Sequence, residues 1–88
     1  MAFPGGSAYA MARDVAGGFT AVSERTFRTM TRPDLDQLGF EIDRHLRELR
    51  GEQAPLDDIA AIQQRNRRIQ RLTSALAVLR AYRQKAKT

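Results

Sequence analysis

The sequence predicts an all-α protein built around an antiparallel helical hairpin, with helices at about residues 34–50 and 57–83. Three observations predict this fold. Both segments carry apolar residues at three- and four-residue spacing, which places those residues on one face of a helix. The connector at 52–56 is short, and its Pro55 prevents the two helices from fusing. A short connector between two striped helices makes them antiparallel neighbours, and each stripe then covers the other.

Residues 1–30 are expected to form an irregular N-terminal arm that is only partly ordered, ahead of a hairpin module at residues 31–88. Within the arm, the Ala-rich segment 8–16 favours a short helix. Gly17 and Gly18 would end this helix, because glycine is the usual residue after a helix C-terminus. A helix of this length is not stable alone in water and needs tertiary support.

Segment 19–31 allows two interpretations. It is rich in Thr, Val and Phe, as strands are, and two short strands could meet around residues 23–26. Helical spacing is also present, at Phe19, Ser23, Phe27 and Met30. We favour the absence of strands, because no Asn-Gly or Asp-Gly marks a turn and an isolated two-stranded hairpin is marginal.

The first helix of the hairpin has clear start and stop signals. Pro33 suits a first helical turn, and Asp34 complements the positive end of the helix. Gly51 stands at a natural stop position. The expected buried stripe consists of Leu35, Leu38, Ile42, Leu46 and Leu49. Phe40 points away from this stripe, so it is either an isolated surface aromatic or a contact for another chain.

The second helix begins after Asp57 and Asp58, whose charges suit a helix N-terminus. Its stripe consists of Ile59, Ile62, Asn66, Ile69, Thr73 and Leu76. Asn66 stands between two isoleucines in this stripe. It is either a polar group at the edge of the seam or a buried residue that fixes register and oligomeric state, as in coiled coils.

The two helices differ in length, and the difference predicts an exposed surface. The first is about 25 Å long and the second about 40 Å, so about 15 Å of the longer helix lacks cover from its mate. We expect the uncovered part to be the C-terminal end. Apolar residues there lie almost all the way round the helix, at Leu72, Ala75, Leu76, Val78, Leu79 and Tyr82. Residues 8–30, a second copy or a different protein would have to cover them.

Charge is distributed unevenly along the chain. Residues 1–58 hold seven Arg and ten acidic residues, a net charge of −3, whereas residues 59–88 hold eight basic residues and no acid, a net charge of +8. The basic face of the long helix is expected at Arg65, Arg67, Arg68 and Arg71. This face could contact phosphate groups, meet an acidic protein surface or remain solvated, and charge patterning does not decide among the three.

Length and composition limit the class of protein. Eighty-eight residues make one domain at most, and a lone monomer of this size buries only about 60% of its unfolded surface. The absence of cysteine excludes disulfides and thiolate metal sites. No apolar run approaches the roughly 20 residues that span a bilayer. We expect the protein to act in the cytoplasm or within a large macromolecular assembly.

Residue types that carry chemistry are sparse. His45 is the only histidine, and no second His or Cys accompanies it as a metal ligand. Asp57 and Asp58 are adjacent, so their side chains would point apart on a helix and would not form a catalytic pair. The two Gly-Gly pairs lack the spacing of a phosphate-binding loop. We therefore expect neither enzyme activity nor a bound cofactor or metal.

Two family resemblances accompany these patterns. Residues 35–82 resemble the small helical-hairpin co-chaperones of type III secretion needle subunits, through a Gly/Pro turn and the Ser-Ala-Leu-Ala-Val-Leu run at 74–79. This resemblance implies a cytoplasmic complex that shields another protein's helix, although the Arg-rich run at 65–71 departs from the family. Residues 8–50 resemble phage head–tail joining proteins of the gpW type, through a helix, a small hairpin and a helix opened by Thr-Arg-Pro-Asp-Leu (31–35). That resemblance implies a phage structural or connector protein, to whose pattern the second long helix is foreign.

Taken together, these patterns predict a small non-enzymatic assembly or adaptor subunit that binds a protein partner or a second copy of itself. The expected partner-binding residues are Leu72, Leu76, Leu79, Tyr82 and Phe40. The main alternative is a nucleic-acid-binding module that uses the arginine-rich face of the long helix. A secretion-type chaperone or a phage connector is a further alternative.

Overall fold

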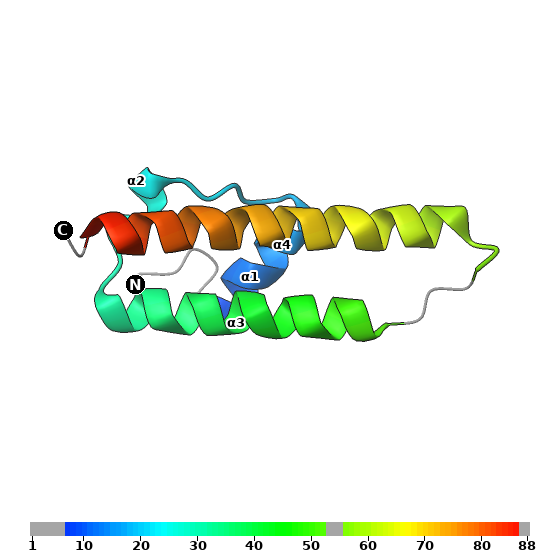
Figure 1. The fold of residues 1–88 in the computed structure, drawn as a ribbon, viewed down its shortest axis with the longest axis horizontal. Helices are drawn as coiled ribbons and strands as arrows, with labels where there is room; N and C mark the ends of the chain where they lie inside the picture. Colours follow the sequence, from blue (N-terminus) through cyan, green and yellow to red (C-terminus); the bar gives the residue numbers. More distant parts are fainter. Residues whose placement is uncertain (1–6, 53–55, 87–88) are drawn as a thin grey trace.

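The computed structural model describes residues 7–52 and 56–86, and these residues form four α-helices and no strand (Figure 1). The all-α class is therefore confirmed, and the strands considered for segment 19–31 do not form. The helices are α1 (Ala8–Gly17), α2 (Glu24–Phe27), α3 (Arg32–Gly51) and α4 (Ile59–Ala86).

Helix α1 is the short helix expected near the N-terminus. The Ser7 hydroxyl accepts a hydrogen bond from the Ala10 amide at 3.1 Å, which satisfies one of the free amides at the helix start. At the other end, Gly18 adopts a left-handed conformation with φ of 82°, and its amide donates to the Val15 carbonyl at 3.1 Å. A side chain at this position would be strained, so the second glycine of the pair allows the chain to turn back.

Helix α2 is a single turn held by one buried aromatic residue. The Ser23 amide donates to the Thr26 hydroxyl at 3.2 Å, which fixes the start of the turn. The Phe27 ring is fully buried, and its centroid lies 5.6 Å from that of the Tyr82 ring in α4. Lys85 in α4 donates to Glu24 at 2.9 Å, and this hydrogen bond lowers the pKa of the Glu24 carboxyl. Segment 19–30 is therefore tied to the far end of the chain.

Helix α3 begins two residues before the predicted start, because its capping residue is Thr31. The Thr31 amide donates to Asp34 Oδ2 at 3.0 Å, and the Asp34 amide donates to Thr31 Oγ1 at 3.3 Å. These two hydrogen bonds satisfy the backbone amides of Thr31 and Asp34 at the helix start. Pro33 lies in the first turn. The whole predicted stripe is buried, at Leu35, Leu38, Ile42, Leu46 and Leu49.

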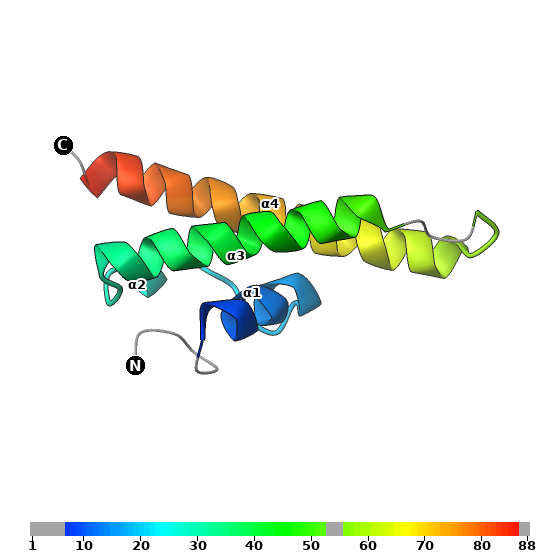
Figure 2. The same cartoon turned by 90° about the horizontal axis from the view of Figure 1, so that it is seen from below.

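Helix α4 is the longest element, with 28 residues. It starts at Asp58, whose side chain accepts from the Ala61 amide at 3.0 Å. Figure 1 shows α3 and α4 side by side and running in opposite directions. The view in Figure 2 shows α1 against one side of this pair, where it contacts both helices.

A single core joins all parts of the described chain. Its residues come from α1, α2, the link before α3, the whole length of α3 and the second half of α4. Besides the stripe of α3, they include Met11, Ala12, Val15, Ala16, Phe27, Met30, Leu72, Ala75 and Leu79. The expectation of an irregular, loosely ordered arm is corrected for the described residues 7–30. That segment carries two helices and supplies six of these buried side chains.

The uncovered part of α4 is its beginning and not its C-terminal end, so that prediction is wrong. An ion pair between Asp36 and Arg83 places the start of α3 beside the end of α4. At the other end, Arg65 Nε donates to the Leu49 carbonyl at 2.7 Å, so residues 59–64 of α4 precede the level at which α3 ends. The first turns of α4 therefore extend past the C-terminal end of α3 (Figure 1).

Candidate protein-binding groove

The residues expected to bind a partner at the end of α4 are largely interior. Leu72 and Leu79 are 0% and 1% exposed, and Leu76 and Tyr82 are half-buried against the same core. Of the expected set, Phe40 alone is well exposed, at 56%, on the outer face of α3. Three candidates were considered for covering this end of α4: residues 8–30, a second copy and a different protein. In the structure, residues of the N-terminal segment cover it.

Two of the four expected basic contacts have structural partners within the chain. Arg65 donates to the carbonyls of Leu49 and Arg50, at 2.7 Å and 3.4 Å, and so satisfies the end of α3. Arg71 Nη1 donates to the Ala16 carbonyl at 3.1 Å and places its charge at the negative end of α1. Both interactions stabilise helix C-termini, which lack partners for their last carbonyls.

Arg67 and Arg68 differ from these two arginines. Both are exposed, and neither makes an ion pair or a side-chain hydrogen bond within residues 7–52 and 56–86. They stand on either side of α1's C-terminal end, since Arg67 lines a groove with Gly18 and Arg68 lines a smaller hollow with Arg13 and His45. Their charges are therefore available to a ligand.

Two roles were considered for Asn66, a polar group at the edge of the seam and a buried residue that fixes register. Asn66 is exposed, and the seam position between Ile62 and Ile69 belongs to Arg65. The half-buried and buried positions of α4 include 62, 65, 69, 72, 76 and 79, and this face places position 65 rather than 66 against α3. Position 65 faces the end of α3, where its guanidinium finds carbonyl oxygens.

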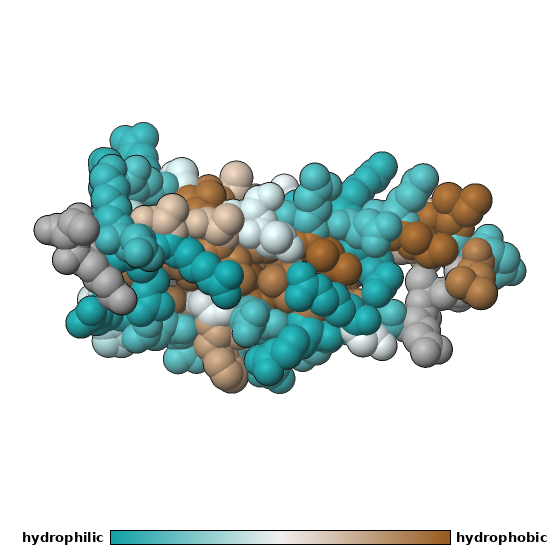
Figure 3. All heavy atoms as spheres, viewed as in Figure 1, coloured by the Kyte–Doolittle hydropathy of each residue, from teal (hydrophilic) through white to brown (hydrophobic). Residues whose placement is uncertain are grey.

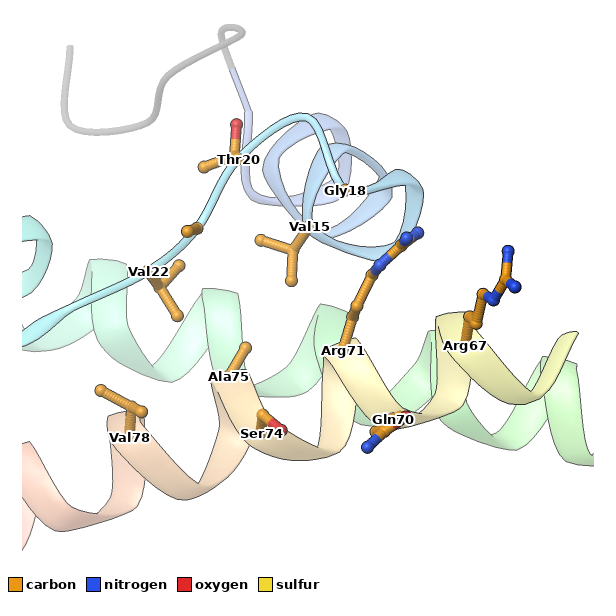
Figure 4. A pocket seen from close by; sticks show the side chains of 11 residues that line it. Val15, Gly18, Thr20, Val22, Arg67, Gln70, Arg71, Ser74, Ala75 and Val78 are labelled. Atoms are coloured by element: carbon orange, nitrogen blue, oxygen red, sulfur yellow. The ribbon is translucent and has the colours of Figure 1, made fainter. Parts of the chain in front are cut away.

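A concave surface lies between α1, the non-helical segment 18–22 and α4, and we name it the α1–α4 groove (Figure 4). Its volume is about 570 Å³, within the range of ligand-binding clefts. The groove is lined by Val15, Gly18, Thr20, Ala21, Val22, Arg67, Gln70, Arg71, Ser74, Ala75 and Val78.

The α1–α4 groove is divided between an apolar part and a cationic part. Val22 and Val78 are half-buried at one end, close to Ala75 (Figure 4). Arg67 and Arg71 extend from α4 at the other end, beside the C-terminal end of α1 (Figure 4). The groove therefore presents apolar side chains at one end and guanidinium groups at the other.

Gly18 shapes the cationic end of the groove. A Cβ atom at this position would lie 3.0 Å from Cζ of Arg71. Since glycine has no Cβ, the guanidinium can lie directly over the turn and reach the Ala16 carbonyl. The turn and the arginine thus depend on each other for their positions.

A second apolar surface lies at the projecting start of α4, and we name residues 56–60 the α4 tip. Leu56 and Ile59 are 95% and 67% exposed, although the sequence placed Ile59 in the buried stripe. Figure 3 shows hydrophobic surface gathered at this end of the molecule. Asp57 and Asp58 lie between the two apolar residues and are exposed. The tip therefore combines apolar side chains with two acids.

His45 packs against an aromatic ring. Its ring stacks on Tyr9 with centroids 5.3 Å apart, and its Nε2 atom is buried without a hydrogen-bond partner among the described residues. Glu41, one turn earlier, is also buried, and Arg44 lies 3.7 Å from its carboxylate. Within residues 7–52 and 56–86, no group of three or more His, Asp or Glu side chains could hold a metal ion.

Comparison with protein-family models, with curated proteins and with solved structures finds no match to this chain. Among the described residues, no helix has both the length and the apolar character needed to cross a membrane. Sequence reasoning missed Val15, Val22 and Val78 as groove residues, because only the fold brings these three together.

Proposed function

We propose that this protein is a small adaptor or assembly subunit that binds an acidic, apolar segment of a protein in the α1–α4 groove. The single observation that carries the proposal is the groove's division into a valine-lined part and an arginine-lined end. In this proposal α3 and α4 act as an antiparallel hairpin that serves as a rigid scaffold. The groove replaces the Leu72–Leu79 surface, whose leucines are already used in the core.

The energetics of the groove support a ligand of mixed character. Covering an apolar side chain such as Val22 or Val78 favours binding by about 25 cal/mol per Å² of apolar area removed from water. A carboxylate beside Arg67 would form a charge-assisted hydrogen bond with a guanidinium that has no partner among the described residues. Arg71 would add its charge without leaving Ala16.

The open wall of the groove supports a polypeptide as the ligand. Residues 20–22 belong to no helix, and the amides of Ala21 and Val22 donate no hydrogen bond to the residues that the structure describes. Such main-chain groups can pair with an added peptide segment, which is a common mode of peptide recognition. The apolar and basic side chains would then select the sequence of that segment.

Peptide binding tests the proposal. A fluorescent amphipathic peptide with Leu on one face and Glu on the other is expected to bind, whereas the same peptide with Lys in place of Glu is not. The Arg67→Glu variant is expected to bind the Leu/Glu peptide at least about tenfold more weakly, because a charge-assisted contact becomes repulsive. Fluorescence anisotropy titration measures both effects.

Arg68→Glu is the matched control, because it makes the same charge change one residue away and outside the groove. This variant is expected to keep the parent's affinity for the Leu/Glu peptide. Equal losses in Arg67→Glu and Arg68→Glu would contradict the groove as the binding site. They would indicate attraction to the basic surface as a whole.

A second candidate function is nucleic-acid binding, favoured by the adjacent exposed arginines Arg67 and Arg68, which have no partner among the described residues, on a helix that has no acidic residue. In that case the affinity for a duplex DNA oligonucleotide should fall steeply with salt, with a slope of about −0.9 per phosphate contacted. Replacing either arginine with glutamine should reduce affinity and slope about equally. A parent protein with no salt-dependent affinity for the oligonucleotide would eliminate this candidate.

A further inference from the structure

We propose that the acidic, apolar segment that occupies the α1–α4 groove is the α4 tip of a second copy of this chain. This inference rests on the proposed function and adds the identity of the partner. The tip and the groove are complementary in character: one offers Leu56 and Ile59 with two acids, and the other offers valines with Arg67 and Arg71. Contacts of this kind would join the chains head to tail.

The α4 tip is built to present its side chains rigidly. Asp58 caps α4, with its side chain accepting from the Ala61 amide at 3.0 Å and its carbonyl accepting from the Ile62 amide at 3.1 Å. The capped helix fixes Ile59, and Leu56 precedes the cap on a turn. Asp57 is exposed and has no partner among the described residues. A ligand held in one geometry loses less entropy on binding than a free segment does.

Charge complementarity favours the tip over the other acidic surfaces. Asp36 pairs with Arg83, and Glu48 pairs with Arg44 at 3.3 Å, so these acids of α3 are already neutralised. Two other exposed apolar side chains lie on the body of the molecule: Phe40 on α3, and Phe19, which lines the smaller hollow with Glu48 and Glu52. The tip differs because it projects beyond the end of α3 (Figures 1 and 3). Its small cross-section allows it to enter a concave surface.

The arrangement of the two surfaces requires two copies. The arginines of the groove stand on the helix that the tip begins, and Ile59 and Arg71 are 12 positions apart, or about 18 Å along its axis. A continuous helix cannot fold back on itself, so a chain's tip cannot reach its own groove. In each contact, one copy would use its tip and the other its groove. Repeated contacts of this kind either close into a ring or a two-fold pair, or extend into a longer assembly.

Self-association is expected to be weak because the tip is small. Interfaces below about 1,200 Å² in total are typical of transient encounters. We expect the weight-average mass of the parent to rise between about 10 µM and about 1 mM in sedimentation equilibrium, and to fall again at high salt as the charged contact is screened.

Mixing two defective variants is the sharpest test. The tip variant carries Leu56→Ser and Ile59→Ser, and the groove variant carries Arg67→Glu; all three positions are exposed, so the fold is expected to survive. Each variant alone is expected to associate at least about tenfold more weakly than the parent. An equimolar mixture retains one intact tip and one intact groove, so it is expected to form a complex of two chains and nothing larger.

Two variants serve as controls, and the outcomes separate this inference from the proposed function. Phe40→Ser and Arg68→Glu are expected to associate like the parent. A parent that stays monomeric to about 1 mM, yet binds the Leu/Glu peptide through Arg67, overturns this inference and leaves the proposed function intact. Self-association that survives in the tip variant or disappears in Phe40→Ser also overturns it. If neither peptide binding nor self-association depends on Arg67, both proposals fail.

Discussion

Replacing Leu72 with alanine is expected to lower the free energy of unfolding by about 2 to 5 kcal/mol. Leu72 is fully buried in the core shared by α1, α3 and α4, so the change removes apolar contacts and leaves a cavity. A domain of this size has a total stability of only about 5 to 15 kcal/mol, so the loss is a large fraction of it. Urea denaturation followed by circular dichroism measures the change.

Leu56→Ala is the matched control for Leu72→Ala. The side chain and the substitution are the same, but Leu56 is almost fully exposed at the α4 tip. Its replacement is expected to change the free energy of unfolding by less than about 0.5 kcal/mol. Comparable losses of unfolding free energy at both positions would contradict the burial of Leu72 in the core. A negligible loss at Leu72 would restore the interpretation of this leucine as a partner contact.

Replacing Phe27 with alanine is expected to lower the free energy of unfolding by about 3 to 5 kcal/mol. Phe27 anchors the single turn of α2 and packs on Tyr82 near the end of α4. Without the ring, α2 loses its main attachment and the end of α4 loses its cover. Urea denaturation measures the loss, and Tyr82 in the folded variant is expected to become more accessible to collisional quenchers of tyrosine fluorescence.

Phe19→Ala provides the control for Phe27→Ala, because Phe19 is 85% exposed in the same N-terminal segment. We expect it to change the free energy of unfolding by less than about 0.5 kcal/mol. If Phe27→Ala were equally mild, residues 19–30 would not be the cover of α4. The end of the long helix would then require another partner, as the sequence first indicated.

Local signals were sufficient to predict α1, α3 and α4, but not the single turn of α2. The Thr31–Asp34 capping pair, Pro33 and the regular stripe of α3 lie within one segment, and each favours the same helix. Helix α1 was likewise predicted by its alanines and by Gly18, whose left-handed conformation ends it. These features depend on neighbours only a few residues apart, which is why the sequence alone reveals them.

Register was the feature that local signals could not determine. The unequal helix lengths were predicted correctly, but which end remains uncovered depends on contacts between distant residues, such as Asp36 with Arg83 and Arg65 with Leu49. The same limit applies to Asn66, since a shift of one position replaces it with Arg65 in the seam.

The candidate site could be predicted only in part. The basic character of α4 was evident from its arginines, but their division into bonded and available groups required the positions of Leu49 and Ala16. The apolar part of the groove combines α1, segment 18–22 and α4. Val22 lies in the segment whose structure was ambiguous, so no periodic pattern connected it with the valines of the two helices.

The pairing of residues 7–30 with α4 has a consequence for how the chain folds. The hydrogen bond from Arg71 to Ala16 spans 55 positions, and the one from Lys85 to Glu24 spans 61. Closing loops of this length costs chain entropy before any contact repays it, so such contacts slow folding relative to helical bundles with purely local packing. We expect α3 and α4 to associate early, and the amino-terminal helices to dock onto them in the last, rate-limiting step.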